Sequence, residues 1–307
     1  MNALIQSLVQ ANFAPERIIP QAPMSRYTTF RTGGPADVLV QIASAKEVGV
    51  VLGAAKRAGV PVTVIGNGSN LLVRDGGIRG LVLRISNAFS AIEREDDRLY
   101  VQSGASLSAC AQFAQREGLT GLEAIGGIPG TVGGGAVMNA GAYGGEMSQV
   151  VTKVSAVSAL SGHVITFEGD ELAFGYRSSA MMRADVIITD VVMQLSPGNP
   201  DAIRLRMEEF ARARREKQPL EFPSAGSTFK RPEGYFAAKL IDDCGLRGLS
   251  VGGAQVSEKH AGFIINTGSA TSSDILALME QVAARVYDAT GVTLEPEVRI
   301  LGEDSRD

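Results

Sequence analysis

The sequence predicts an α+β fold with a mixed α/β portion and two domains, and three observations predict it. Strand and helix periodicities alternate early in the chain, where a helix opening at the capping box 44–47 lies between the apolar strands 38–42 and 62–65. Three further strand-like segments fall between 150 and 195. The segment SPGNP at 196–200 is typical of a linker, so the second half is expected to form its own domain.

Each expected element has its own periodicity. Helices are expected where apolar residues recur every three and four positions, and strands where they alternate or form short runs. The expected helices have apolar faces at 4–9, 48–55, 107–114, 203–211, 240–244 and 275–286. The expected strands are 38–42, 62–65, 71–73, 81–85, 98–102, 150–156, 164–167, 185–195 and 263–266. Alternation near the C-terminus predicts a last strand with Val292, Leu294, Val298 and Ile300 on one face, and Pro296 places it at a sheet edge.

Composition excludes several classes of function. The 307 residues are 45% hydrophobic and 20% charged with a net charge of −4, so neither nucleic acid nor an anionic membrane is an expected partner. Cys110, Cys244, His163 and His260 have no neighbours at metal-ligand spacing, so no metal site is expected. The N-terminus does not resemble a signal peptide, and no uncharged apolar run reaches the roughly 18 residues of a membrane span. The expected location is the cytoplasm.

The glycine-rich stretch 125–146, IGGIPGTVGGGAVMNAGAYGGE, is the most unusual part of the chain. A helix is not expected here, because glycine costs about 1 kcal/mol and proline about 3 kcal/mol relative to alanine in a helix. Glycines let backbone amides approach a bulky ligand. The stretch therefore predicts a loop that holds a phosphate-bearing cofactor. Tight turns between closely packed elements are an open alternative.

A second glycine-rich segment, GNGSN at 66–70, follows the strand 62–65. It differs from the dinucleotide fingerprint G-x-G-x-x-G, because Leu71 stands where the third glycine belongs and no helix is expected next. A cofactor loop and a simple Asn-Gly hairpin turn are equally compatible with this segment alone.

Eight segments together resemble one family, the UDP-N-acetylenolpyruvoylglucosamine reductases of peptidoglycan precursor synthesis. They occur in the family's order over nearly the whole chain, so the resemblance is specific although each segment is weak. The segments are TTFRTGG (28–34), GNGSNLLV (66–73), GGIPGTVGGGAVMNAGAYGGE (126–146), FGYRSS (174–179), PSAGSTFKRP (223–232), KLIDDCGLRG (239–248), KHAGFIIN (259–266) and LEPEVRILG (294–302). The length and the form AGSTFK are similar to the family's shorter class, which lacks an extra substrate-capping loop.

The resemblance implies an FAD-binding domain of the vanillyl-alcohol-oxidase (PCMH) type, expected at 31–196 after an N-terminal segment 1–30. A C-terminal α+β substrate domain is expected at 197–307. The implied flavoenzyme binds FAD non-covalently and uses NADPH to reduce the enolpyruvyl ether of UDP-N-acetylglucosamine to UDP-N-acetylmuramate. A monomer is expected. The residues expected to hold FAD are Gly66, Asn67, Gly68, Ser69, Asn70, Leu71, Gly127, Ile128, Gly130, Thr131, Gly134, Asn139 and Gly141.

The reaction adds a hydride and a proton to an alkene, so charge develops beside an existing carboxylate and needs preorganised donors. By resemblance, Arg177 clamps this carboxylate, Ser227 is the proton donor and Glu297 lies by the enolpyruvyl group. The residues alone favour plainer interpretations: Arg177 is a surface charge at a strand end, Ser227 shapes a turn, and Glu297 lies on a solvated strand face. Glu295 fits that face equally well, and only the family motif selects Glu297.

Tyr176, Lys217 and Lys230 are expected to bind the substrate. Two other functions stay open at this point. A module that binds a nucleotide or flavin without reducing anything would need only the loops. Some oxidases of the same superfamily attach their flavin to His or Cys, but the four such residues here lie outside the cofactor loops, which argues against covalent flavin.

Overall fold

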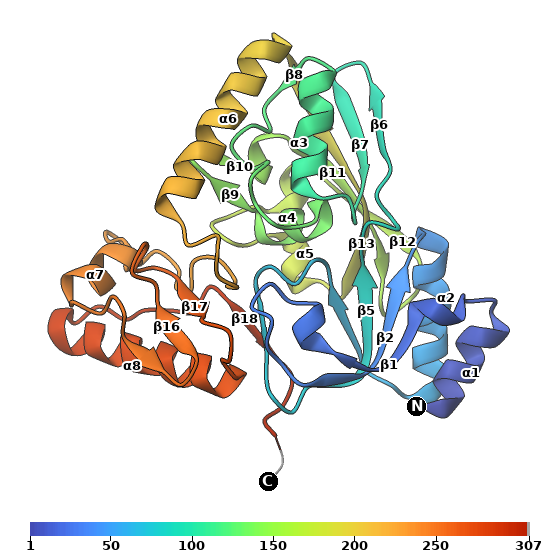
Figure 1. Cartoon of the computed structure of the whole chain (residues 1–307). Coiled ribbons are helices and arrows are strands. Elements are labelled where there is room, and N and C mark those ends of the chain that lie inside the picture. Colours follow the sequence, from blue (N-terminus) through green and yellow to red (C-terminus); the bar gives the residue numbers. More distant parts are fainter. Residues whose placement is uncertain (306–307) are drawn as a thin grey trace. The chain divides into compact units, whose positions relative to one another are not determined.

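A computed structural model describes residues 1–305 of the chain (Figure 1). The chain forms two compact units, each assembled from three segments. The first unit contains Met1–Ile19, Val38–Asn67 and Gly80–Arg214, and the second contains Pro20–Asp37, Gly68–Arg79 and the chain from Arg215 onward. The expected domain ranges 1–30, 31–196 and 197–307 stay a prediction.

One sheet has the strand order β1-β2-β5-β3. Its strands are β1 (Ile18–Pro23), β2 (Pro35–Ile42), β5 (Ile78–Ile85) and β3 (Val62–Ile65). The helix α2 (Ala45–Ala58) begins where the Ser44 side chain accepts a hydrogen bond from the Glu47 amide, and it ends at Gly59 in the left-handed region. Its apolar face and that of α1 (Asn2–Gln10) share one core with this sheet, so the expected α/β portion is present.

The first unit also contains an antiparallel sheet with the order β12-β11-β13-β7-β6. Its strands are β12 (Val164–Glu168), β11 (Val151–Ser158), β13 (Val186–Gln194), β7 (Arg98–Gln102) and β6 (Ile92–Glu95). The helices α3 (Leu107–Arg116) and α4 (Val132–Met138) lie over this sheet (Figure 1), and Cys110 is buried in the shared core. The remaining elements are η1 (Pro15–Arg17), β8 (Leu119–Thr120), β9 (Gly141–Ala142), β10 (Gly145–Glu146), η3 (Met147–Gln149), η4 (Gly169–Leu172), α5 (Ala180–Arg183), β14 (Ser196–Pro197) and α6 (Pro200–Lys217).

The helix α4 corrects the expectation that the glycine-rich stretch forms only loops. Seven residues of VGGGAVM are helical, and the Thr131 side chain caps them by accepting a hydrogen bond from the Gly134 amide. A Cβ on Gly133 would lie 2.7 Å from the Ser103 Cβ, so this face of the helix fits against the neighbouring chain only because it has no side chain. Close packing therefore outweighs the low helix propensity of glycine.

The second unit is built around α8 (Ser272–Thr290) and the small antiparallel sheet β15-β16-β17. Asp75 accepts hydrogen bonds from the backbone amides of Ser272 and Ser273, both at 2.9 Å, and so supplies an anion to the start of α8. The other elements are η2 (Met24–Arg26), β4 (Leu71–Val73), α7 (Ala237–Asp243), β15 (Ser250–Val251), β16 (Ala254–Val256), β17 (Ile264–Asn266) and β18 (Arg299–Leu301).

The expected last strand is shorter than predicted. Only β18 is regular, and it pairs in parallel with β4. Leu294 and Val298 are buried as expected, whereas Ile300 is 36% exposed, because Pro296 interrupts the alternation. The hairpin alternative for GNGSN is also wrong, since β3 pairs with β5 while β4 pairs with β18. Among residues 1–305, no helix has the length and apolar character needed to cross a membrane.

Candidate functional site

The glycine-rich stretch is fastened to the end of β7 in the first unit. The amides of Val132 and Gly133 donate to the carbonyls of Ala105 and Ser103, at 2.7 and 2.9 Å, and the Leu107 amide donates to Gly130 at 3.0 Å. Two segments far apart in sequence therefore run side by side just before α3 and α4 begin.

The loop after β3 meets the same place. A Cβ on Gly66 would lie 2.6 Å from the Thr131 hydroxyl oxygen, so glycine at the end of β3 avoids a clash with the residue that caps α4. Gly104 is similarly enclosed, since its Cβ would lie 2.1 Å from the Ser86 carbonyl oxygen. Three chain segments thus converge, and two of them approach through glycines.

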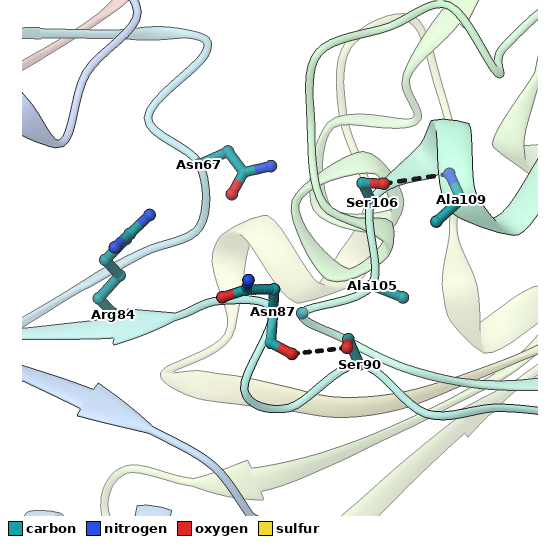
Figure 2. Close-up of a pocket in the computed structure, with 8 residues that line it drawn as sticks. Asn67, Arg84, Asn87, Ser90, Ala105, Ser106 and Ala109 are labelled. Carbon is teal, nitrogen blue, oxygen red and sulfur yellow. Dashed lines mark hydrogen bonds between the residues drawn. The ribbon is translucent and has the colours of Figure 1, made fainter. Parts of the chain in front are cut away.

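A cavity of about 330 Å³ opens beside this convergence (Figure 2). Ser106 caps α3 by accepting the Ala109 amide at 3.0 Å, and Ser90 donates to the Asn87 carbonyl at 2.6 Å. Nearby, the hydroxyls of Ser86 and Ser103 are buried without a hydrogen-bond partner. The cavity is lined by Asn67, Arg84, Asn87, Ser90, Gly104, Ala105, Ser106 and Ala109.

These features fit a bulky, phosphate-bearing cofactor. The lining supplies amide, hydroxyl and guanidinium donors, and the enclosed glycines leave backbone close to the cavity. Of the residues predicted to hold a cofactor, Asn67 lines this cavity. The prediction missed Arg84, Asn87 and the segment 104–106. The pattern SGAS after an expected strand and before an expected helix was the available signal for this last segment.

The other predicted cofactor residues mostly organise the backbone around them. Asn139 is buried and left-handed, donating to the Gly175 carbonyl at 3.1 Å and accepting the Ser148 amide at 2.9 Å. Gly141 accepts from Arg177, and Ile128 packs against the core of the first unit. Gly68, Ser69, Asn70 and Leu71 belong to the second unit.

Arg177 occupies the corner of a tight turn in the first unit. Gly175 and Ser178 exchange backbone hydrogen bonds at 3.0 and 3.2 Å, and Arg177 between them adopts φ +51°. Its Nη2 donates to the Gly141 carbonyl at 3.4 Å, and the adjacent Ser179 hydroxyl donates to the Val137 carbonyl at 2.8 Å. The turn is therefore docked on the glycine-rich stretch, and Tyr176 beside it is 55% exposed.

Ser227 and Glu297 lie on neighbouring backbone in the second unit. The Glu297 amide donates to the Thr228 carbonyl at 2.8 Å, and Asn70 donates to the Glu297 carbonyl at 3.1 Å. Thr228 is buried and also accepts the Ile264 amide through its hydroxyl at 3.0 Å, which anchors the exposed Ser227. The structure thus brings Ser227, Glu297 and Asn70 together, and Thr228 is a support that the sequence did not reveal.

The structure also distinguishes Glu297 from Glu295. The Glu295 carboxylate is exposed and pairs with Lys230 at 3.1 Å, whereas Glu297 is half-buried. An exposed ion pair of this kind contributes about 0–1 kcal/mol. Lys217 lies exposed at the end of α6.

His260 and Cys110 are held by packing and lie in buried or partly buried positions. The His260 Nδ1 accepts the Gly262 amide at 3.2 Å while the ring packs edge-on against Phe263, and burial lowers the pKa of this imidazole. Burial raises the pKa of the Cys110 thiol to about 12. Neither group is placed for attachment to a cofactor in the cavity of Figure 2, since neither lines it. Among residues 1–305 no cluster of three or more His, Cys, Asp or Glu side chains is arranged to hold a metal ion.

Two parts of the chain match models of known protein families. Residues 36–168 match the family model of an FAD binding domain, and residues 218–301 match the C-terminal domain of UDP-N-acetylenolpyruvoylglucosamine reductase. The first range contains the whole convergence of loops described above. The second contains Ser227 and Glu297.

Relatives match the chain over nearly its full length. The UDP-N-acetylenolpyruvoylglucosamine reductase of Clostridioides difficile is 47% identical over 94% of this chain and 95% of its own. That of Pediococcus pentosaceus is 47% identical over 97% of this chain and 99% of its own. The crystal structure of the Thermus caldophilus enzyme superposes with a TM-score of 0.78 at 36% identity, covering 93% of this chain and 98% of that one. The chain therefore belongs to the UDP-N-acetylenolpyruvoylglucosamine reductase family, which confirms the predicted resemblance, the fold class, the FAD cofactor and the oxidoreductase activity.

Proposed function

We propose that this chain reduces the enolpyruvyl ether of UDP-N-acetylglucosamine to the lactyl ether, UDP-N-acetylmuramate, with NADPH as the reductant. The observation that carries the proposal is the 47% identity to a reductase of that name over 94% of this chain. The UDP-sugar and NADPH are its small-molecule partners. A cytoplasmic location and a monomeric state belong to the same proposal.

Bound FAD supplies the hydride for the alkene. In this proposal the cavity beside Asn67 and Ser106, with the enclosed glycines Gly66 and Gly104, holds part of that cofactor. The convergence of three segments supports this assignment, because it places backbone and side-chain donors around one space.

Arg177 binds the substrate carboxylate and stabilises the enolate that develops beside it. A guanidinium suits this task because its fork of N–H donors matches a carboxylate. The docking of its turn on Gly141 and Val137 supports the role, since a donor held in place before the reaction contributes most to stabilising developing charge.

Ser227 delivers the proton to the α-carbon, and Glu297 orients the groups around it. A serine hydroxyl is a weak acid, so it serves only against a strongly basic, carbanion-like centre. The pairing of the Thr228–Phe229 backbone with Pro296–Glu297 supports this assignment, because it keeps the two side chains on adjoining rigid segments.

Tyr176, Lys217 and Lys230 bind the remainder of the substrate in this proposal. Lys230 is paired with Glu295 in an exposed ion pair, which a substrate phosphate displaces at little cost. Lys217 and Tyr176 are exposed and accessible to a ligand.

The test separates the two half-reactions. In the Ser227→Ala holoenzyme, NADPH should bleach the yellow flavin at a rate close to that of the wild type, while reoxidation by the enolpyruvyl substrate should fall by at least a hundredfold. Ser224→Ala, in the same loop, is the matched control and should leave both rates unchanged. Equal losses in both half-reactions, or no loss in either, would refute the role of Ser227. Wild-type protein that is yellow but is not bleached by NADPH would favour a flavin-binding module instead.

A further inference from the structure

The side chain of Asn70 is bonded to the segment that carries Glu297, and both belong to the second unit. The Asn70 Nδ2 donates to the Glu297 carbonyl oxygen at 3.1 Å, and the Asn70 carbonyl accepts the Arg299 amide at 3.0 Å. These two bonds extend the parallel pairing of β4 with β18 toward Glu297. The sequence prediction placed Asn70 among the FAD ligands, whereas the structure engages its side-chain amide with the chain itself.

The peptide groups on both sides of Glu297 are fixed. Its amide donates to the Thr228 carbonyl at 2.8 Å, and its own carbonyl accepts the hydrogen bond from the Asn70 side chain. Thr228 is buried and donates through its amide to the Gly262 carbonyl at 2.9 Å, so this partner is anchored in turn. A residue has only two soft backbone dihedrals. Holding both flanking peptide groups therefore fixes the direction in which the Glu297 side chain leaves the backbone.

Asn70 is itself held by its neighbours in the chain. The Gly68 carbonyl accepts the Thr29 amide at 3.2 Å, and a Cβ on Gly68 would lie 2.1 Å from the Tyr27 carbonyl oxygen. Gly68 also adopts φ +64°, so both space and conformation favour glycine there. On the other side, Leu72 of β4 is fully buried in the core of the second unit. Anchored backbone therefore presents the Asn70 amide to its partner.

We propose that Asn70 is a positioning residue for the reduction, which acts by holding Glu297 in its working orientation and not by binding FAD or substrate. This inference rests on the proposed function, because Glu297 takes part in the reaction only there. An asparagine amide suits the task, since it offers an N–H donor to the carbonyl without placing a charge beside the Glu297 carboxylate. Such support matters because a misplacement of about 1 Å can slow a reaction about a hundredfold.

The experiment compares holoenzyme carrying Asn70→Asp, Asn70→Ser or the control Asp304→Asn. Asn70→Asp keeps the shape of the side chain but replaces the N–H donor by a carboxylate oxygen, which repels the Glu297 carbonyl. Asn70→Ser shortens the side chain, so its hydroxyl no longer reaches that carbonyl. Asp304 is a matched control, because its side chain also joins the two paired segments, through an exposed ion pair with Arg74 at the far end of β4 and β18.

Stopped-flow kinetics should separate the effect on Glu297 from an effect on ligands. In Asn70→Asp the limiting rate of flavin reoxidation by the enolpyruvyl substrate should fall at least tenfold, at an unchanged half-saturating substrate concentration. Flavin reduction by NADPH and the fraction of FAD released on dilution should stay at the wild-type values. Asn70→Ser should show a smaller loss of the same kind, and Asp304→Asn should show none. Hydrogen exchange, followed by mass spectrometry, should quicken over residues 294–302 in both Asn70 variants and stay unchanged in α8.

Four results would overturn the proposal. Release of FAD with equal losses in both half-reactions would make Asn70 a cofactor ligand, and a higher half-saturating substrate concentration at an unchanged limiting rate would make it a substrate ligand. Unchanged reoxidation would remove any role, and failure of both Asn70 variants to fold would make the residue purely structural. The proposed function is judged separately by reoxidation of the wild-type enzyme. If that fails, hydrogen exchange and FAD release still show whether Asn70 holds the segment of Glu297.

Discussion

The contact between Gly66 and Thr131 can be tested by the stability of variants, without any added substrate. Alanine at position 66 would place its Cβ 2.6 Å from the Thr131 hydroxyl oxygen and 3.4 Å from its methyl carbon. Gly66 does not have a positive φ, so alanine adds no backbone strain and the whole effect is steric. Overpacking of this kind costs about 1–3 kcal/mol.

Removing the Thr131 side chain should relieve that clash. The Thr131 hydroxyl caps α4, so Thr131→Ala alone should cost about 1 kcal/mol. In the double variant, however, the nearest remaining atom is the residue 131 Cβ, at the ordinary contact distance of 3.6 Å. The double variant should therefore be about as stable as Thr131→Ala alone, and the two substitutions should be strongly non-additive.

Thermal unfolding of the holoenzyme, followed by far-ultraviolet circular dichroism, measures these costs. The chain has no tryptophan, which makes fluorescence less suitable. At about 2.1 cal/mol/K of unfolding entropy per residue, each kcal/mol should shift the melting temperature of this 307-residue chain by about 1.5 °C. Gly49→Ala is the control, since no atom lies within 4 Å of its Cβ position on α2, and it should stabilise the chain slightly. Additive costs for the Gly66 and Thr131 substitutions would show that the end of β3 does not approach α4 as described.

Two further predictions concern the cap that Asp75 provides to α8 and the reactivity of the two cysteines. Asp75→Asn should lower stability by about 1 kcal/mol, because it weakens the anion at the start of α8. Burial alone would raise the pKa of the Asp75 carboxyl, but hydrogen bonds from Ser273 and Ser272 lower it. Its contribution is therefore present above the unfolded-state pKa of about 4 and is lost as pH falls through the lower folded value, so acid melts of wild type and Asp75→Asn should converge there. Separately, iodoacetamide at pH 8 should modify the half-buried Cys244 before Cys110, as followed by mass spectrometry, and the reverse order would contradict the burial of Cys110.

Local signals predicted much of the fold. The helix α2 begins at the Ser44 capping box and ends at Gly59, and Cys110 is a core residue of α3, both as expected from spacing. These features depend on residues only a few positions apart, and such local patterns can be read directly from the sequence. The cap that Asp75 provides to α8 could not be predicted, because its partners lie 197 and 198 positions away.

The candidate site was only partly predictable for the same reason. GNGSN and the glycine-rich stretch were recognisable as unusual backbone, whereas Arg84 is one charged residue in a strand and has no local signal. The choice of Glu297 over Glu295 could not come from strand alternation, which treats the two alike. It came from the resemblance to the family, and the half-buried position of Glu297 beside the exposed Glu295 is a tertiary fact that supports it.

Two requirements, close packing and a space for a ligand, therefore explain the glycine content of this stretch. The sequence alone could not separate them. Close packing accounts for several of its glycines: a Cβ on Gly126 would lie 2.5 Å from the Ala111 Cβ, and one on Gly145 would lie 2.8 Å from the Ala124 Cβ. The alternative of tight packing between elements thus holds for these positions. Because the same packing seats α4 against the end of β7 and beside Gly66, it also builds the space that the cofactor is proposed to fill. The stretch acts first as a packing element, and any capacity to bind a ligand follows from that packing.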